Sequence, residues 1–199
     1  MSASVTLRTA VAADAPAIHR LIADNLEIGH LLPRTLADVE RSAPRFVVAA
    51  LDGEVVGCAE LAPLSPSVAE VRSLVVAEDS RGHGIGPSLV AQVATEGTAR
   101  GFATLCAFTH EPSHFVRMGF TIVPHIWVPE KIAHDCTSCS LFRRCGQHAV
   151  MLPLRAGVSV GPERPAAVIH GTRSSAARRL PLHPVAADAA VPATEAIPA

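Results

Sequence analysis

The chain has 199 residues, of which 49% are hydrophobic, and its formal net charge is −1 at pH 7. This length suffices for one folded domain with a sizeable core, whereas the near-neutral charge excludes a strongly basic surface for nucleic acid. No apolar run is long enough to span a bilayer, and residues 1–10 lack the pattern of a signal peptide. We therefore expect a cytoplasmic protein with no nucleic-acid or membrane partner.

Residues 5–154 alternate between strand and helix patterns. In chain order, the expected elements are a strand at 5–8, a helix at 16–25 capped by Asp14, a short helix after a capping box that begins at Thr35, a hairpin at 45–64 that turns at Asp52-Gly53, a strand at 68–76, a helix at 85–100, a strand at 103–108, a helix at 113–118, and strands at 120–123 and 148–154. Because strands outnumber helices and the hairpin comes early, we predict an α+β fold with a mixed sheet.

The composition changes after Leu154. Residues 155–199 are rich in Ala, Pro and Arg, contain no aromatic residue, and have prolines within every candidate element. Such a segment cannot bury enough apolar surface to offset the entropy of ordering. We predict a folded domain at 1–154 and a disordered tail at 155–199. A docking site around Arg178 and Arg179 is the alternative to a passive solvated tail.

A glycine-rich loop connects the strand at 68–76 to the helix at 85–100. Its residues are Arg81, Gly82, His83, Gly84, Ile85 and Gly86. Glycines admit close backbone approach, and a helix N-terminus presents free N–H groups, so this arrangement is typical of a phosphate site. Pro87 follows Gly86 where a P-loop requires lysine, and the glycine spacing differs from the dinucleotide fingerprint. A plain turn with glycines for tight packing is the alternative.

The loop and two other stretches resemble a known family. The loop from Arg81 to Gly86 is similar to the R-x-x-G-x-G loop of the GNAT superfamily of N-acetyltransferases. The preceding stretch EVRSLVV resembles the fourth strand of that fold, and FVRMGF at 115–120 resembles its late helix and turn. The resemblance covers about 5–154 and implies a mostly antiparallel sheet with helices on both faces. It also implies that N–H groups of Gly82 to Gly86 hold the pyrophosphate of acetyl-CoA, and that main-chain groups of Leu74 and Val76 meet the pantetheine arm in a splayed sheet.

Three further segments narrow the resemblance. HLLPRTLADVE, AEVRSL and WVPEKIAHDCTSCSLFRRC together are similar to the acetyltransferase domain of N-acetylglutamate synthases, in a short form without the kinase-like domain. This resemblance implies L-glutamate as acceptor, a place in arginine biosynthesis, and Arg34, Arg72 and Lys131 as substrate-binding residues. Arginine suits the two carboxylates of glutamate because it binds a carboxylate through two hydrogen bonds. The alternatives are a pair between Arg72 and Glu70, and surface solvation for Arg34 and Lys131.

Acyl transfer requires a deprotonated amine and a donor for the oxyanion, and the N–H near Val75 or Val76 is the candidate donor. Many GNAT enzymes use a tyrosine of the late helix as acid. The matching position here is Phe115, and the chain contains no tyrosine. Candidates for taking or relaying the proton are Glu60, Glu70 and His114. The alternative is direct attack with proton loss to water.

The chain has five cysteines, an odd count that favours free thiols or metal ligands over disulfides in a reducing compartment. Cys136, Cys139 and Cys145 lie within ten residues, and with a neighbouring histidine they could complete a tetrahedral zinc site. Three free thiols are the alternative. Cys58 and Cys106 fall in strand patterns, so we expect them in the core.

Two other functions stay open from the sequence. One is GNAT chemistry on another small amine or on a protein N-terminus. The other is a non-catalytic regulator that binds acyl-CoA, which the missing tyrosine favours. A homodimer is also left open.

Overall fold

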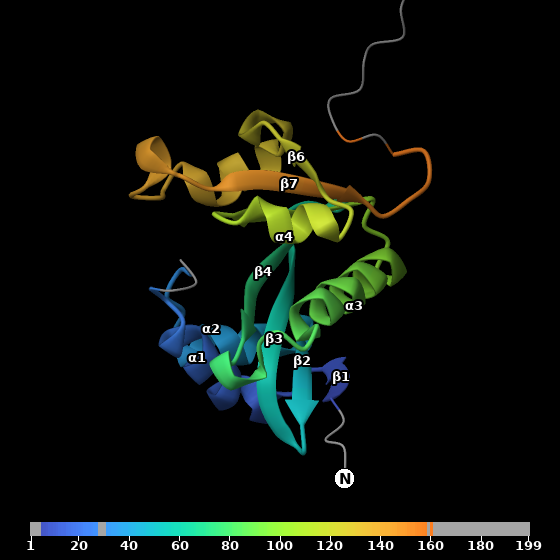
Figure 1. The fold of residues 1–199 in the computed structure, drawn as a ribbon. Coiled ribbons are helices and arrows are strands. Elements are labelled where there is room, and N and C mark those ends of the chain that lie inside the picture. The colour runs from blue at the N-terminus through green and yellow to red at the C-terminus, as the bar shows by residue number, and fades with distance from the viewer. Residues whose placement is uncertain (1–4, 28–30, 159, 161–199) are drawn as a thin grey trace, which may run out of the picture. The chain divides into compact units, whose positions relative to one another are not determined.

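The computed structural model describes residues 5–27, 31–158 and 160. In these ranges seven strands form one sheet (Figure 1). They are β1 (Val5–Thr9), β2 (Phe46–Leu51), β3 (Glu54–Pro63), β4 (Val68–Val76), β5 (Thr104–Thr109), β6 (Thr121–Val123) and β7 (His148–Pro153). Their order is β1-β2-β3-β4-β5-β7-β6, and every pairing is antiparallel except that of β4 with β5. The predicted mixed, mostly antiparallel sheet is confirmed.

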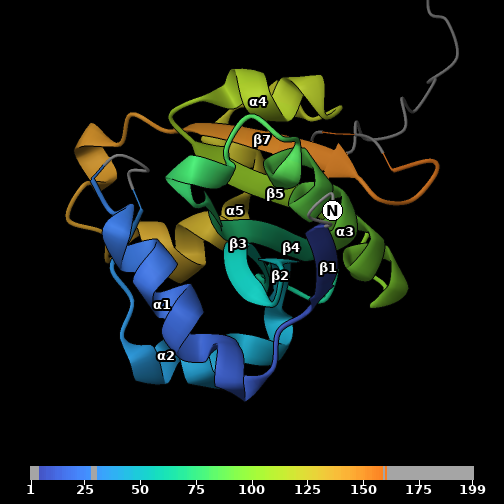
Figure 2. The ribbon, with the colours of Figure 1, turned by 60° about the horizontal axis from the view of Figure 1, so that its bottom comes forward.

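The helices of the described ranges lie on both faces of this sheet. They are α1 (Ala15–Asp24), α2 (Leu36–Ser42), α3 (Ile85–Ala99), α4 (Pro112–Arg117) and the single turn α5 (Pro129–Lys131). Figure 2 shows α1 and α2 on one side of the strands and α3 and α4 on the other, as the α+β prediction requires. A π-helical turn, Ile132–Cys136, follows α5 and was not predicted. None of these helices combines the length and hydropathy that a bilayer-spanning segment needs.

The core explains why the strands are apolar in near-continuous runs. Along β2, Val47 and Ala49 join the cluster under α3, whereas Phe46 and Val48 join the cluster under α1. Successive side chains of a strand point to opposite faces, so a strand covered on both sides needs apolar residues at every position. Two buried layers thus hold the central strands in place.

Gly57 of β3 brings α3 unusually close to the sheet. A Cβ atom at this position would lie 3.2 Å from Leu89 Cδ1 and 3.3 Å from Ile85 Cγ2. A side chain here would push the first turns of α3 away from the sheet by a few tenths of an ångström. The position of the α3 N-terminus is therefore set by its contact with β3, a feature that the sequence analysis did not single out.

The sheet opens between β4 and β5. The two strands pair at only three positions, the last of which joins Glu70 to Cys106, and they separate beyond it. On the other edge of β4, the register with β3 shifts between Cys58 and Glu60, and Ser73 takes a positive φ of 48°. This β-bulge adds a residue to β4 and bends the strand next to the opening. The splayed sheet that the GNAT resemblance implied is therefore present.

The predicted tail lies mostly outside the described residues. Only residues 155–158 and 160 of the segment 155–199 are described, and Arg178 and Arg179 are not among them. The division at Leu154 stays a prediction.

The prediction that the Asp14 side chain caps α1 is wrong. Asp14 precedes α1, but its carboxylate makes no cap hydrogen bond to that helix. It accepts instead from Arg8 Nη1 at 2.6 Å, from Arg8 Nη2 at 2.8 Å and from the Val11 N–H at 2.8 Å. The carboxylate thus ties β1 to the turn that precedes α1, a role set by a strand neighbour rather than by the helix that follows.

This ion pair makes part of the stability pH-dependent. The hydrogen bonds from Arg8 lower the pKa of Asp14 although burial opposes them. A carboxyl whose folded-state pKa lies below its unfolded value stabilises above the unfolded pKa, near 3.9, and loses that contribution as pH falls through the folded pKa. We expect Asp14→Asn to be less stable than the wild type at pH 7, with a difference that vanishes towards pH 2 in urea titrations. Arg8→Gln should lose the same pH dependence, and a difference independent of pH would contradict this account.

Candidate active site

The opening between β4 and β5 leads into a cavity of about 1090 Å³. Its wall combines β4, β5, α2, α4 and α5 with the connection before α2 and the segment after α5. The titratable side chains of that wall are Arg34, Asp38, Arg41, Arg45, Glu70, Arg72, His110, Glu111, His114, Lys131 and Asp135, together with Cys139. A second cavity of about 250 Å³ adjoins the start of α3, and Leu74 and His114 line both. The two cavities therefore adjoin at Leu74 and His114, with Gly86 at the smaller one and the separating strands at the larger.

The glycine loop has the conformation that a backbone anion site needs. Gly82 and Gly84 have φ values of +80° and +77°, and Gly84 is the N-cap of α3. A Cβ at either position would meet nothing within 4 Å, so tight packing does not explain these glycines. The left-handed backbone conformation explains them, because residues with a side chain adopt it only at a cost in conformational free energy. The first N–H groups of α3 have no intrahelical acceptor and can bind an anion.

Arg81 is exposed, but its guanidinium bonds to neighbouring segments of the protein. Its Nε donates to the Val76 carbonyl at 3.1 Å, and its Nη2 donates to Asn25 Oδ1 at 2.6 Å. Asn25, buried at the end of α1, donates in turn to the Leu21 carbonyl at 2.8 Å. In this structure Arg81 therefore holds the loop to β4 and α1, and the backbone N–H groups are left as the loop's anion donors.

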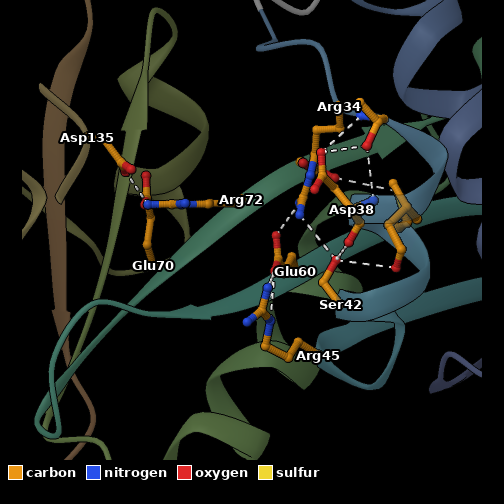
Figure 3. Close-up of polar contacts among 12 residues, drawn as sticks. Arg34, Asp38, Ser42, Arg45, Glu60, Glu70, Arg72 and Asp135 are labelled. Atoms are coloured by element: carbon orange, nitrogen blue, oxygen red, sulfur yellow. Dashed lines mark hydrogen bonds and ion pairs between the residues drawn. The ribbon is translucent and has the colours of Figure 1, made fainter. Parts of the chain in front are cut away.

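Arg34 lines the cavity and pairs with a buried carboxylate behind its wall (Figure 3). Glu60 is 1% exposed; it accepts from Arg34 through one oxygen, and from Arg45 through the other, at 2.9 Å from Nε and 2.7 Å from Nη2. Arg34 also donates to Ser42 Oγ at 3.1 Å and lies 5.5 Å from the centroid of the Phe46 ring. With both oxygens engaged by cations, Glu60 is a poor candidate for a general base.

Arg72 and Lys131 share two carboxylates, Glu70 and Asp135, at another part of the wall. Figure 3 shows Arg72 with these two carboxylates, apart from Arg34 and Glu60. Arg72 donates to Glu70 and to Asp135. Lys131 Nζ lies 2.7 Å from Glu70 Oε1 and 2.9 Å from Asp135 Oδ2, and 5.2 Å from the centroid of the Phe108 ring. We call Glu70, Arg72, Lys131 and Asp135 the four-charge cluster. The pair of Arg72 with Glu70, which the sequence analysis gave as the alternative to substrate binding, is present, and both residues also line the cavity.

His114 lies where the two cavities meet. It is an exposed residue of α4, and its Nδ1 is 2.8 Å from Arg117 Nη2. The next residue, Phe115, is buried against Phe120 in an edge-to-face contact with ring centroids 5.1 Å apart. Of the three predicted proton acceptors, the cavity wall therefore includes Glu70 and His114 but not Glu60.

The prediction of a zinc site is not supported. Across the described ranges, no three His, Cys, Asp or Glu side chains are grouped as a metal site would require, so Cys136, Cys139 and Cys145 are not assembled into one. Burial raises the pKa of Cys136, which disfavours its thiolate. Cys58 and Cys106 are fully buried strand residues, as predicted, and burial raises the pKa of Cys58 to about 12.

The sequence analysis missed Arg45 and Asp135. Asp135 stands four residues after Lys131, a helical spacing that brings opposite charges together and could have indicated it. Arg45 precedes β2 without any such signal. Its contact with Glu60 exists only because β2 and β3 pair in the observed register, Phe46 opposite Glu60.

Comparisons with known proteins agree with this geometry. Residues 15–120 match the model of the acetyltransferase (GNAT) family. An uncharacterized N-acetyltransferase from Chlorobaculum tepidum is 32% identical over 153 residues, which are 77% of this chain and 99% of that protein.

Other similar proteins carry more specific names. An amino-acid acetyltransferase from Ectopseudomonas mendocina is 31% identical over 113 residues, which are 56% of this chain and 26% of that protein. The crystal structure of N-acetylglutamate synthase from Neisseria gonorrhoeae, complexed with coenzyme A and N-acetyl-glutamate, superposes with a TM-score of 0.68 and 26% identity, covering 78% of this chain and 36% of that one. The chain thus spans about a third of that synthase and about a quarter of the Ectopseudomonas relative.

Proposed function

Because the chain belongs to the GNAT family and is an acetyl-CoA-dependent N-acetyltransferase, we propose that it transfers the acetyl group to the α-amine of L-glutamate, the first step of arginine biosynthesis. One observation carries the choice of acceptor. Arg34, Arg72 and Lys131 come from three separate segments and line one cavity. Glutamate brings two carboxylates, each of which needs cationic partners.

The glycine loop and the opened strand fit acetyl-CoA. The free N–H groups at the start of α3 suit its pyrophosphate. From there the smaller cavity, along Leu74 and Gly86, leads to the larger one, so the pantetheine arm would follow β4 towards the separation of β4 and β5. The thioester would then lie where the acceptor cavity begins.

The direction of the β4 backbone favours Val76 over Val75 as the oxyanion donor. Val75 pairs with Cys58, and the Ala77 N–H donates to the Val56 carbonyl at 2.8 Å. Main-chain groups alternate sides along an antiparallel strand, so those of Val75 are directed to β3 and those of Val76 away from it. The Val76 carbonyl accepts from Arg81, which leaves the Val76 N–H as the donor. An N–H at that place can stabilise the negative charge of the tetrahedral intermediate.

The proposed reaction is a direct attack. The amine nitrogen of glutamate forms a bond to the thioester carbon, the carbon–sulfur bond breaks, and coenzyme A leaves as a thiolate. The amine proton passes to water or to His114, which lies beside both cavities. Glu60 and Glu70 are weaker candidates, because cations already bind their carboxylates. His114→Ala tests the relay, since a loss of kcat with unchanged KM for both substrates would assign His114 that role.

Thiol release from acetyl-CoA tests the acceptor. With L-glutamate, L-glutamine, other amino acids and a peptide N-terminus compared at equal concentration, we expect glutamate to give the highest kcat/KM. Preference for another amine would keep the acetyltransferase and discard the acceptor. Coenzyme A binding without turnover on any amine would favour a regulator.

Gly84 provides a test of the loop. Gly84→Ala places a side chain at a φ of +77°, which costs on the order of 1–2 kcal/mol. The free loop is expected to relax out of this conformation, and binding must then restore it, so acetyl-CoA binding should weaken by about tenfold. Gly53→Ala is the matched control, because Gly53 has a φ of +90° in the β2–β3 turn and lines neither cavity. Calorimetry should show weaker binding only for Gly84→Ala. Equal affinities would remove the loop from the cofactor site.

A further inference from the structure

The four-charge cluster carries no net formal charge. Arg72 and Lys131 are cations, Glu70 and Asp135 are anions, and each cation contacts both anions. A carboxylate that arrives at Arg72 and Lys131 therefore finds two carboxylates already bound there. Binding must either leave three anions on two cations or remove one of the two resident carboxylates. Removal is favoured, because like charges held a few ångströms apart repel strongly away from bulk water.

Asp135 is the carboxylate that can leave. Glu70 is fixed, since it lies on β4 between Ala62 of β3 and Cys106 of β5, and its side chain is 4% exposed. The side chain of Asp135 is 29% exposed and faces the cavity from the π-helical turn Ile132–Cys136. π-Helical turns are rare and occur frequently at functional sites. A rotation of Asp135 towards solvent breaks no strand pairing.

We propose that Asp135 is a specificity-determining residue whose carboxylate occupies the place on Arg72 and Lys131 that the acceptor's carboxylate takes. This inference rests on the proposed function, because it assumes an acceptor that carries a carboxylate. An acceptor with a carboxylate replaces Asp135 and keeps both cations paired. An acceptor without a carboxylate leaves Asp135 in place and gains nothing from the two cations.

At neutral pH the carboxylate of Asp135 still competes with the acceptor's carboxylate for Arg72 and Lys131. Burial would raise the pKa of Asp135, but the hydrogen bond from Lys131 and the charges of Arg72, Lys131 and His134 outweigh it and lower that pKa. Asp135 therefore stays ionised at neutral pH, where an acceptor carboxylate is also ionised.

Asp135→Asn tests the inference, because it keeps the shape of the side chain and removes the competing charge. We expect KM for L-glutamate to fall about tenfold, with kcat and the KM for acetyl-CoA within twofold of the wild type. The KM for butylamine, a primary amine without a carboxylate, should not fall. Glu111→Gln removes the same charge from the same cavity wall, but Glu111 is not part of the cluster, so it should lower the glutamate KM much less.

Asp135→Glu separates charge competition from a structural role. It retains the charge, and we expect a glutamate KM within threefold of the wild type. If Asp135 only anchors its turn, Asp135→Asn would instead raise the glutamate KM and lower Tm. Either that rise or an unchanged KM would overturn the inference.

A binding measurement keeps this test independent of turnover. Calorimetry of L-glutamate with the coenzyme A complex should show tighter binding for Asp135→Asn than for the wild type. Absence of glutamate-dependent thiol release in the wild type would overturn the proposed function. Equal or weaker glutamate binding by Asp135→Asn, or binding by neither protein, would overturn the inference.

Discussion

Replacing Arg72 by alanine is expected to lower kcat/KM for L-glutamate by roughly 100-fold, equivalent to about 3 kcal/mol. Arg72 is a partly buried guanidinium on the β4 segment that runs beside the opening, and it lines the acceptor cavity. Its loss removes the bidentate contact that an acceptor carboxylate would make, and Lys131 can replace it only as a point charge. Steady-state kinetics with glutamate and acetyl-CoA varied in turn provide the measurement.

The pattern of the two KM values decides how this result is interpreted. The KM for acetyl-CoA should stay within about twofold of the wild type, because the cofactor path runs along Leu74 and Gly86 and does not include Arg72. Arg72→Lys should recover only part of the activity. Equal losses for both substrates, or full recovery by lysine, would show that Arg72 supports the fold of β4 rather than the acceptor.

Replacing Arg34 by alanine is expected to lower the free energy of unfolding by about 3 kcal/mol. Glu60 is 1% exposed, and Arg34 provides one of its two cationic partners. Without Arg34, one oxygen of a buried carboxylate loses its partner and Ser42 loses a donor. Removal of one member of a buried pair costs more than the pair contributes, because the remaining charge stays desolvated. Urea unfolding at pH 7 measures the loss.

Arg41→Ala is the matched control for this loss. Arg41 pairs with Asp38 within α2, but their side chains are 71% and 41% exposed, so we expect a loss below about 1 kcal/mol. The double variant Arg34→Ala/Glu60→Gln should recover part of the stability, because it no longer buries a carboxylate that has lost one of its two cationic partners. Similar losses in Arg34→Ala and Arg41→Ala would contradict the burial argument.

Much of the fold could be predicted from local sequence signals. The turn at Asp52-Gly53 has φ values of 49° and 90°, which this dipeptide adopts readily, and Thr35 forms the predicted capping box with Asp38. The helix α3 ends one residue before its predicted end, with Gly101 in the left-handed region. These features depend on interactions between residues a few positions apart, so the local sequence is enough to predict them.

Motif spacing predicted the backbone conformation of the glycine loop but not the arrangement of the cysteines. The loop works through backbone conformation, which the glycines themselves determine. A zinc site instead requires several side chains to point at one centre, and the spacing of Cys136, Cys139 and Cys145 does not specify direction. The described residues contain no such convergence.

The sequence by itself determined the order of strands and helices, the glycine loop and the cationic residues Arg34, Arg72 and Lys131. Only the tertiary structure decided their partners, since Arg72 meets Asp135 across 63 positions and Lys131 meets Glu70 across 61. The local pattern around each residue is the same whether it is solvated, paired or free to bind an acceptor. Which of these holds depends on strand register, on the separation of β4 from β5 and on the turn that carries Asp135, all of which arise from packing between distant parts of the chain.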